Sequence, residues 1–204
     1  MSSSPRTDRP TDVTGRIAAR VRALRRQRGY TLDALAARSG VSRSAISLVE
    51  RSAASPTAVV LERLATGLAV PVADLFDSPP PAAPPDPVAR RAAQARWRDP
   101  ASGYVRRTVS PPGWPTPIRL AEIEFPAGAV VAYETADRDV TIHQQVWVLA
   151  GTIEVTLGAR THRLGTGDCL AMRVDEPVAF RNTAARPARY LVAVVTEPVA
   201  GRRT

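Results

Sequence analysis

Arg43 and three nearby serines are the side chains of this sequence best suited to reading a DNA base. They lie in SRSAISL, where Ser42, Ser44 and Ser47 carry hydroxyls on either side of the long guanidinium side chain of Arg43. A guanidinium can donate two hydrogen bonds to O6 and N7 of guanine, whereas a serine hydroxyl is a weaker and less selective partner. We therefore expect Arg43 to contact a base; the alternative is that it only binds a phosphate.

The second half of the chain offers few groups for catalysis. Its candidates are the single cysteine, Cys169, and the two histidines, His143 and His162. Cys169 lies in the apolar run CLAM without a basic neighbour, which favours a buried structural thiol over a redox sensor. His143 is adjacent to Gln144, so strand alternation places these two side chains on opposite faces, and His162 is expected to be solvated. We predict no catalytic residue and no enzyme activity.

The base-reading residues need a helix presented by a tight turn, and Thr31–Arg51 has that pattern. Apolar residues recur at helical spacing in LDALAA, Gly40 follows where a helix must end, and Thr31 and Ser42 fit N-caps. Two helices joined by a glycine-containing turn can place the second one in the DNA major groove. Glu50, near the end of the second helix, is expected to pair with an arginine of the same domain, because phosphates repel a carboxylate.

Three further helices are predicted around this pair, giving five in residues 14–77. One starts at Gly15, and another is opened by Pro56. The fourth helix is expected to bury Val59, Val60, Leu64 and Leu68, and PVADLF is expected to form the fifth. Residues 1–13 lack a core and are expected to be a disordered tail; the alternative is an arm that enters the minor groove through Arg6 and Arg9.

Positive charge is concentrated in the part of the chain that holds these helices. The 204 residues carry 28 basic and 19 acidic side chains, a net charge of +9. Residues 1–77 carry +5, residues 78–112 carry +4 and residues 113–204 are neutral. This excess of arginine suits contacts with phosphates. The single cysteine, the lack of a long apolar run and the lack of a signal peptide predict a cytoplasmic protein without a membrane segment.

A proline-rich stretch separates the helical pattern from a β pattern. Residues 78–93 contain PPPAAPPDP and are expected to form an extended linker. Over residues 94–198, runs such as IRLAEIEF and VTIHQQVWVLAG alternate with turn residues, which predicts a β sandwich or barrel. Trp114 and Trp147 are expected in its core or in an interface, and residues 199–204 are expected to be a tail. The predicted fold class is an all-α domain followed by a β jelly-roll barrel.

Residues 15–77 resemble the lambda-repressor-like, XRE-type helix-turn-helix family. The resemblance lies in ARVRALRRQRGYTLDALAARSGVSRSAISLVER, SPT, LERLATGL and VPVADLF. It implies a five-helix domain of a transcriptional regulator that reads an inverted repeat as a dimer. It places Thr31 and Leu32 where the family contacts phosphate, and Leu32 stands where glutamine is frequent. It places the base-facing positions at Ser42, Arg43, Ser44, Ser47 and Leu48.

Residues 95–198 resemble the cupin family, in particular the small cupin appended to XRE-type regulators. The resemblance lies in VWVLAGTIEVTLG, HRLGTGDCLAM and RNTAARPARYLVAV. It places the four metal-ligand positions of that family at Gln144, at Val178, and at either Asp137 and Asp139 or Arg138 and Val140. None of these is a histidine, and a metal ion needs converging nitrogen, oxygen or sulfur ligands. We therefore predict no metal and no other cofactor.

The mouth of the predicted barrel is a candidate ligand pocket. Its expected lining is Tyr133, Gln144, Val146, Val148, Arg173, Val178 and Phe180. An apolar pocket with one amide and one arginine suits a small molecule, including an anion; the alternative is a collapsed barrel that only dimerises. We predict a regulator that binds double-stranded DNA as a homodimer and senses a small-molecule effector. Two alternatives stay open, a metal-independent isomerase or epimerase fused to a DNA-binding domain and an antitoxin-like module that binds a protein.

Overall fold

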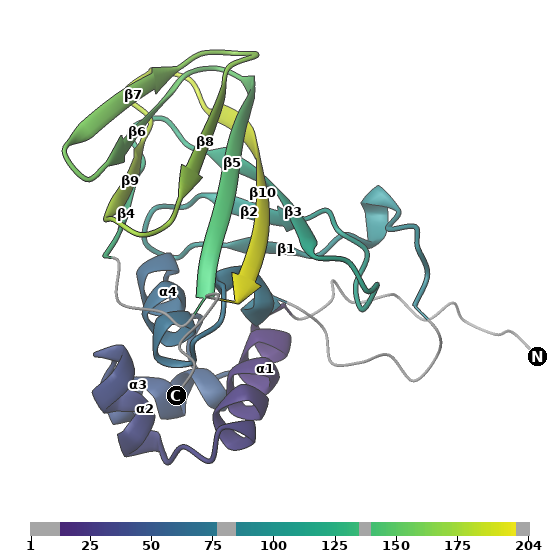
Figure 1. The fold of residues 1–204 in the computed structure, drawn as a ribbon, viewed down its shortest axis with the longest axis vertical. Helices are drawn as coiled ribbons and strands as arrows, with labels where there is room; N and C mark the ends of the chain where they lie inside the picture. The colour runs from purple at the N-terminus through teal and green to yellow at the C-terminus, as the bar shows by residue number, and fades with distance from the viewer. Residues whose placement is uncertain (1–12, 77–84, 135–139, 199–204) are drawn as a thin grey trace, which may run out of the picture.

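The first half of the protein is a small helical domain in this computed structural model, which describes residues 13–76, 85–134 and 140–198. Its α-helices are α1 (Val13–Gln27), α2 (Leu32–Ser39), α3 (Arg43–Glu50) and α4 (Ala58–Gly67). Their apolar faces meet in one core (Figure 1). α1 begins two residues before the predicted start at Gly15, because Val13 is itself buried. Arg6 and Arg9, the candidate minor-groove residues, lie outside the described residues.

The prediction of five α-helices is wrong, because the fifth segment forms a short 3-10 helix. Within the described residues, PVADLF contributes only η1 (Val72–Phe76). The N–H of Asp74 donates to the carbonyl of Pro71 at 3.0 Å, an i→i+3 bond that closes a tighter turn than an α-helix does. The segment still buries Leu75 and Phe76 in the core.

The turn between α2 and α3 has the predicted caps. The hydroxyl of Thr31 accepts from the N–H of Ala34 at 3.0 Å, and that of Ser42 accepts from the N–H of Ala45 at 3.2 Å. Gly40 ends α2 with φ at 65°, a left-handed conformation that a Cβ would disfavour. These local bonds fix the direction in which α3 leaves the turn.

α4 begins at Ala58 rather than at the predicted Pro56. The hydroxyl of Thr57 accepts from the N–H of Val60 at 3.3 Å, so Thr57 is the N-cap and Pro56 lies outside the helix. Its buried face also differs from the predicted one, since Val59 is 37% exposed. The buried apolar residues are Ala58, Leu61, Leu64 and Ala65, with Leu68 just beyond the helix.

The second half of the chain is a two-layer β structure, which confirms the predicted β-rich domain. After η2 (Arg91–Ala93), its strands are β1 (Arg96–Arg98), β2 (Val105–Thr108), β3 (Ile118–Phe125), β4 (Val130–Tyr133), β5 (Val140–Ala150), β6 (Ile153–Leu157), β7 (Arg160–Leu164), β8 (Cys169–Arg173), β9 (Val178–Arg181) and β10 (Ala188–Pro198). They form a six-stranded sheet in the order β1-β2-β3-β10-β5-β8 and a four-stranded sheet in the order β4-β9-β6-β7. The inward side chains of both sheets make the core between them.

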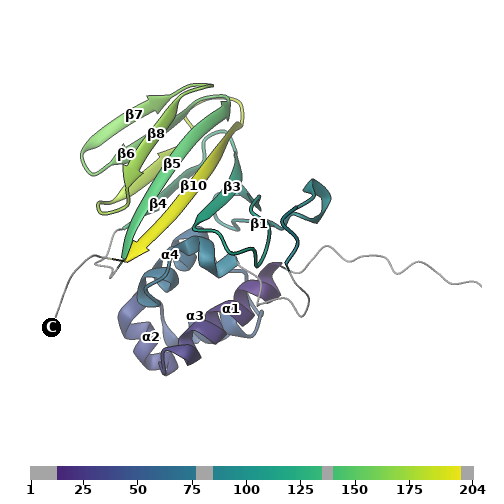
Figure 2. The same ribbon diagram turned by 45° about the vertical axis from the view of Figure 1, so that its right-hand side comes forward.

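Both views of the ribbon place α4 beneath one end of the two sheets (Figures 1 and 2). Aromatic rings connect the two halves there. Phe76 of η1 contacts Trp97 of β1 with ring centroids 5.5 Å apart, and Trp97 contacts Tyr104 at 5.6 Å. The series continues through Phe125 to Tyr190, deep between the sheets. The helical domain therefore packs on the β domain through a continuous aromatic core.

A buried carboxylate adds a polar link between the two halves. Asp99, which follows β1 and is 2% exposed, accepts from the N–H of Ala58 at 3.0 Å. Ala58 is the first residue of α4, where backbone N–H groups lack intrahelical partners and a negative charge is favoured. Asp99 is held in turn by the N–H of Ser102 at 2.8 Å.

Among the described residues, no helix is long and apolar enough to span a membrane.

Candidate nucleic-acid interface and ligand cavity

The first turns of α3 present the predicted base-facing side chains on the surface. Ser42, Arg43 and Ser44 are exposed, Ser47 is half-buried, and Leu48 is 41% exposed. On the opposite face of α3, Ile46 and Val49 are buried and hold the helix against the core. The helix therefore keeps a polar outer face and an apolar inner face.

Arg43 is paired with Asp33 of α2. Its Nε lies 3.2 Å from Oδ1 of Asp33, and the side chains are 65% and 75% exposed. An exposed ion pair of this kind contributes little to stability. The guanidinium can therefore exchange the carboxylate for a nucleic-acid acceptor at small cost.

The start of α2 lies beside α3 and offers backbone donors rather than side-chain donors. The hydroxyl of Thr31 is used as the N-cap, and Leu32 is half-buried against the core. The first N–H groups of a helix attract phosphate oxygens. At the two predicted phosphate-contact positions, the main chain is thus the better candidate.

Glu50 pairs inside the domain, which was predicted from its sequence position. It accepts from Nε of Arg25 at 2.6 Å and from Nη2 of the same residue at 2.8 Å, in a two-pronged contact that joins α3 to α1. Nε of Arg22 lies 3.7 Å from the carboxylate. The hydrogen bond to Glu50 raises the pKa of the Arg25 guanidinium, against a smaller opposing effect of burial. This pair braces the helix that carries the base-facing residues.

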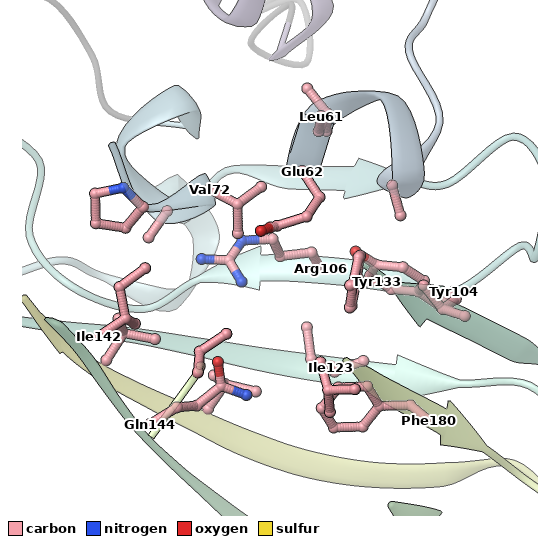
Figure 3. A pocket seen from close by; sticks show the side chains of 18 of the residues that line it. Leu61, Glu62, Val72, Tyr104, Arg106, Ile123, Tyr133, Ile142, Gln144 and Phe180 are labelled. Carbon is pink, nitrogen blue, oxygen red and sulfur yellow. The ribbon is translucent and has the colours of Figure 1, made fainter. Parts of the chain in front are cut away.

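A cavity of about 90 Å³ lies where the helical domain meets the two sheets (Figure 3). Of the predicted pocket residues, Tyr133, Gln144, Val178 and Phe180 line it. The rest of its wall is largely apolar and comes from both halves of the chain. The helical domain contributes Ala58, Leu61, Glu62, Pro71, Val72, Ala73 and Phe76.

Three predicted pocket residues do not line this cavity. Val146 and Val148 are buried between the sheets and are not part of the cavity lining. Arg173 points out to solvent, where its Nε lies 2.5 Å from Asp175. The β5–β8 register explains this, because Arg173 lies opposite His143, on the face of the sheet turned away from Gln144.

Arg106 and Glu62 are the two charged residues of the cavity lining, and neither was predicted from the sequence. Arg106 lies on β2, is 8% exposed, and holds its guanidinium carbon 4.8 Å from the ring centre of Phe76. Strand alternation puts Arg106 on the same face as Tyr104, which was an available signal. That signal did not say which face of the strand is inside.

Three tyrosines of the β domain meet the cavity in their neutral form. Burial raises the pKa of Tyr104 to about 12, and the nearby Arg106 charge opposes this shift. Burial also raises the pKa values of Tyr133 and Tyr190 well above their usual range. Tyr104 and Tyr133 share a hydrogen bond between their side chains. These hydroxyls are therefore hydrogen-bonding groups rather than charges.

Comparison with known proteins matches the two halves in succession. A family model for a helix-turn-helix domain matches residues 16–76, and one for a cupin domain matches residues 122–194. The chain is 27% identical over 166 residues to the HTH-type transcriptional regulator SutR of Escherichia coli K12, covering 81% of this chain and 86% of SutR. The chain therefore carries a helix-turn-helix domain followed by a cupin domain, and over most of its length it is similar to a transcriptional regulator. Its fold also matches an HTH_3 family transcriptional regulator from Vibrio cholerae with a TM-score of 0.69, 22% identity, and coverage of 90% and 96% of the two chains.

The metal-ligand positions of the cupin family hold no metal-binding cluster in the described part of this chain. There, no group of three or more histidine, cysteine, aspartate or glutamate side chains converges. Gln144 and Val178 both face the cavity, and an amide with a valine is a poor donor set for a metal. Asp137, Arg138 and Asp139 lie outside the described residues.

One expectation for the cupin domain is wrong, because Cys169 faces solvent. Cys169 was expected to be a buried structural thiol and is exposed instead. It lies opposite Trp147 in the β5–β8 register, on the outer face of the six-stranded sheet. Trp147 is 48% exposed and Trp114 is 39% exposed, so neither is a core residue. The alternation of side chains along β8 places Cys169 on the outer face. The apolar residues next to it in the sequence therefore did not predict its burial.

Proposed function

We propose that this DNA-binding regulator reads an operator with α3, as a homodimer, and that a small-molecule effector binds its cavity. The exposed outer face of α3 is the observation that carries the proposal. Arg43 and the serines around it project from the first turns of a helix braced from behind by the Glu50–Arg25 pair. A helix presented in this way fits the major groove, where side chains near its start meet base edges.

Each residue has a proposed role in that complex. Arg43 would leave Asp33 and donate to a guanine, and Ser42, Ser44 and Ser47 would contact neighbouring bases or phosphates. Leu48 would make an apolar contact with a thymine methyl group. Thr31 and Leu32 would place the first N–H groups of α2 against the phosphate backbone. The proposed DNA-binding unit is residues 14–77 and the proposed cupin unit residues 94–198, acting in the cytoplasm where the DNA target lies.

A dimer would place two α3 helices one turn of DNA apart, about 34 Å, on an inverted repeat. The outer face of the six-stranded sheet supports the choice of interface. It exposes Trp147 beside the edge strand β8, and large exposed aromatic side chains are enriched where proteins associate. Replacing Trp147 with glutamate should convert a dimer to a monomer in sedimentation velocity. A monomeric wild-type protein at micromolar concentration would contradict this part of the proposal.

The test of DNA reading is selection of genomic fragments by the purified protein, followed by footprinting of the enriched sites. We expect protection of two symmetric half-sites whose centres are about 10 base pairs apart. Binding to these sites should weaken steeply with added salt, because phosphate contacts release counterions. Fragments enriched without any shared sequence, or protection that does not depend on sequence, would show that α3 does not read bases.

A further inference from the structure

The wall of the cavity brings together two buried opposite charges from different domains. Glu62 comes from α4 of the helix-turn-helix domain and Arg106 from β2 of the cupin domain, and each is 8% exposed. Figure 3 shows the two charged ends pointing toward one another, with the open space of the cavity beside them. Both charges also act on the hydroxyl of Tyr104, in opposite directions. Two opposite charges, one from each domain, therefore line the same cavity within reach of a ligand there.

The rest of the cavity limits what such a ligand can be. Aliphatic and aromatic side chains such as Ile142, Phe180 and Val194 supply most of its lining. A guanidinium stays protonated at any ordinary pH and binds carboxylates with two parallel hydrogen bonds. A mainly apolar molecule with one carboxylate would contact the apolar lining with its hydrocarbon part and Arg106 with its carboxylate. A ligand amine would instead face the positive charge of Arg106.

We propose that the cavity binds a small apolar monocarboxylic acid, whose carboxylate replaces that of Glu62 beside Arg106 and so loosens α4 from the cupin domain. This inference deepens the effector part of the proposed function and rests on it. The cavity volume of about 90 Å³ is several times the roughly 10–15 Å³ that one water occupies, so a small organic acid is of suitable size. Hexanoate and benzoate are acids of this class.

The proposed exchange explains how an acid would change operator binding. A ligand alters an equilibrium only if it interacts differently with two arrangements of the protein. Here the acid competes with a side chain of α4 itself, so the bound state lacks one contact between the domains. The helix-turn-helix domain keeps its own core, while its docking on the cupin domain is weakened and rests on the aromatic rings and on Asp99. In a dimer this would disturb the spacing of the two α3 helices.

Isothermal titration calorimetry on the full-length protein, without DNA, tests the ligand class. Hexanoate and benzoate should bind at least about tenfold more tightly than hexanamide and benzamide, which are similar in size but uncharged. The variant Arg106→Gln should bind an acid and its amide equally. Arg173→Gln is the matched control, because that arginine points to solvent and should keep the preference. Equal binding of acid and amide by the wild-type protein would overturn the proposal.

The variant Glu62→Gln tests whether the carboxylate of the acid replaces that of Glu62. The result stands even if Arg106→Gln does not fold. Removing the competing negative charge should tighten binding of hexanoate by about tenfold, and hydrogen exchange in α4 should then respond less to the acid than in the wild type. Unchanged or weaker binding of hexanoate by Glu62→Gln would refute the competition. Because these measurements use no DNA, acid binding without operator binding would reject only the operator model. Operator binding without acid binding would reject only this inference.

Discussion

Arg43 is the residue whose substitution should separate base reading from phosphate binding. A two-pronged contact with guanine discriminates against other bases by about 1–3 kcal/mol, which is roughly a 5- to 150-fold preference. Arg43→Ala should lose affinity for the operator by that factor and leave affinity for unrelated DNA nearly unchanged. Fluorescence anisotropy on operator and scrambled duplexes measures both. Arg51→Ala removes an exposed arginine just beyond α3 and is the control; equal losses on both duplexes for Arg43→Ala would mean that it only binds phosphate.

Glu50 should matter to the stability of the helical domain more than any exposed acid does. Its carboxylate is 6% exposed and Arg25 is 13% exposed, so Glu50→Ala leaves a largely buried guanidinium without its main partner. Loss of one member of a buried pair costs about 3 kcal/mol. Urea unfolding measures the change in the free energy of unfolding. Glu134→Ala is the control, because Glu134 is 86% exposed and its pair with Arg63 should contribute less than about 1 kcal/mol.

The two arginines of the cupin domain show where prediction from sequence reached its limit. Strand alternation correctly separates His143 from Gln144, since one is exposed and the other lines the cavity. It also places Arg106 on the same face as Tyr104. The β5–β8 register places Arg173 on the same face as His143. Which of these faces is inside depends on the partner strands, which are distant in sequence. Arg173 was therefore placed in the pocket and Arg106 was not.

The helices of the first domain could largely be predicted because their signals are local. Thr31, Gly40 and Ser42 each act within four residues of their own position, and each caps a helix as predicted. The errors in the predicted helix boundaries arise where a neighbouring residue or segment determines where the helix begins or ends. Thr57 displaces Pro56 as the start of α4 by using its hydroxyl. PVADLF forms a 3-10 turn instead of an α-helix, with the N–H of Asp74 bonded to the carbonyl of Pro71 three residues back.

Gly67 is a contact between elements that helix propensity alone would misjudge. A Cβ at this last residue of α4 would lie 2.8 Å from Cβ and 3.0 Å from the backbone of Ser39 in α2. Alanine favours helices over glycine, but here α2 and α4 would have to move apart. Gly67→Ala should lower the free energy of unfolding by about 1–3 kcal/mol in denaturant unfolding. Val59→Ala, on the exposed face of α4, should cost less than about 1 kcal/mol; a stabilised Gly67→Ala would show that the two helices separate easily.

The order of strands and the shared cavity belong to the whole molecule and could not be read from local patterns. β10 is the last strand and lies in the middle of the six-stranded sheet, between β3 and β5. β4, β9 and β6 come together in the other sheet. The aromatic series from Phe76 to Tyr190 depends on this arrangement and on the docking of η1. Composition could predict a β domain and a proline-rich separation, but not that the helical domain closes the cavity.

The buried tyrosines predict that stability falls in strong alkali. Burial raises the pKa of Tyr104 to about 12 in the folded protein, against about 10 in an unfolded chain. The neutral phenol is present in both states below pH 10, so this contribution is intact there and is lost as pH rises from about 10 to 12. A shift of this size is worth about 3 kcal/mol, and Tyr133 and Tyr190 add to the slope. Urea midpoints at pH 9, 10 and 11 measure the loss; Tyr104→Phe should flatten it, and equal slopes for both proteins would contradict this assignment.

Asp99 determines whether the two domains unfold together. It is 2% exposed and accepts from the first N–H of α4, so its removal would leave that buried donor and the part-buried N–H of Ser102 without a carboxylate. Each unsatisfied buried donor costs about 1–3 kcal/mol. Because one of them lies on each side of the domain boundary, Asp99→Ala should weaken docking more than it weakens either core. Calorimetry should then show one transition for the wild type and two for the variant.

Asp86 offers the matched control for that experiment. Its carboxylate also accepts a backbone N–H, that of Val88 at 2.8 Å, but it is exposed and its partner lies two residues away. Asp86→Ala should keep the single transition and the wild-type midpoint. If Asp99→Ala also unfolds in one transition, with both domains destabilised alike, then the aromatic contacts of Phe76 and Trp97 are sufficient to couple the domains. In that case exchange of one charge contact in the cavity would not free the helical domain either, so this measurement bears directly on how an effector could act.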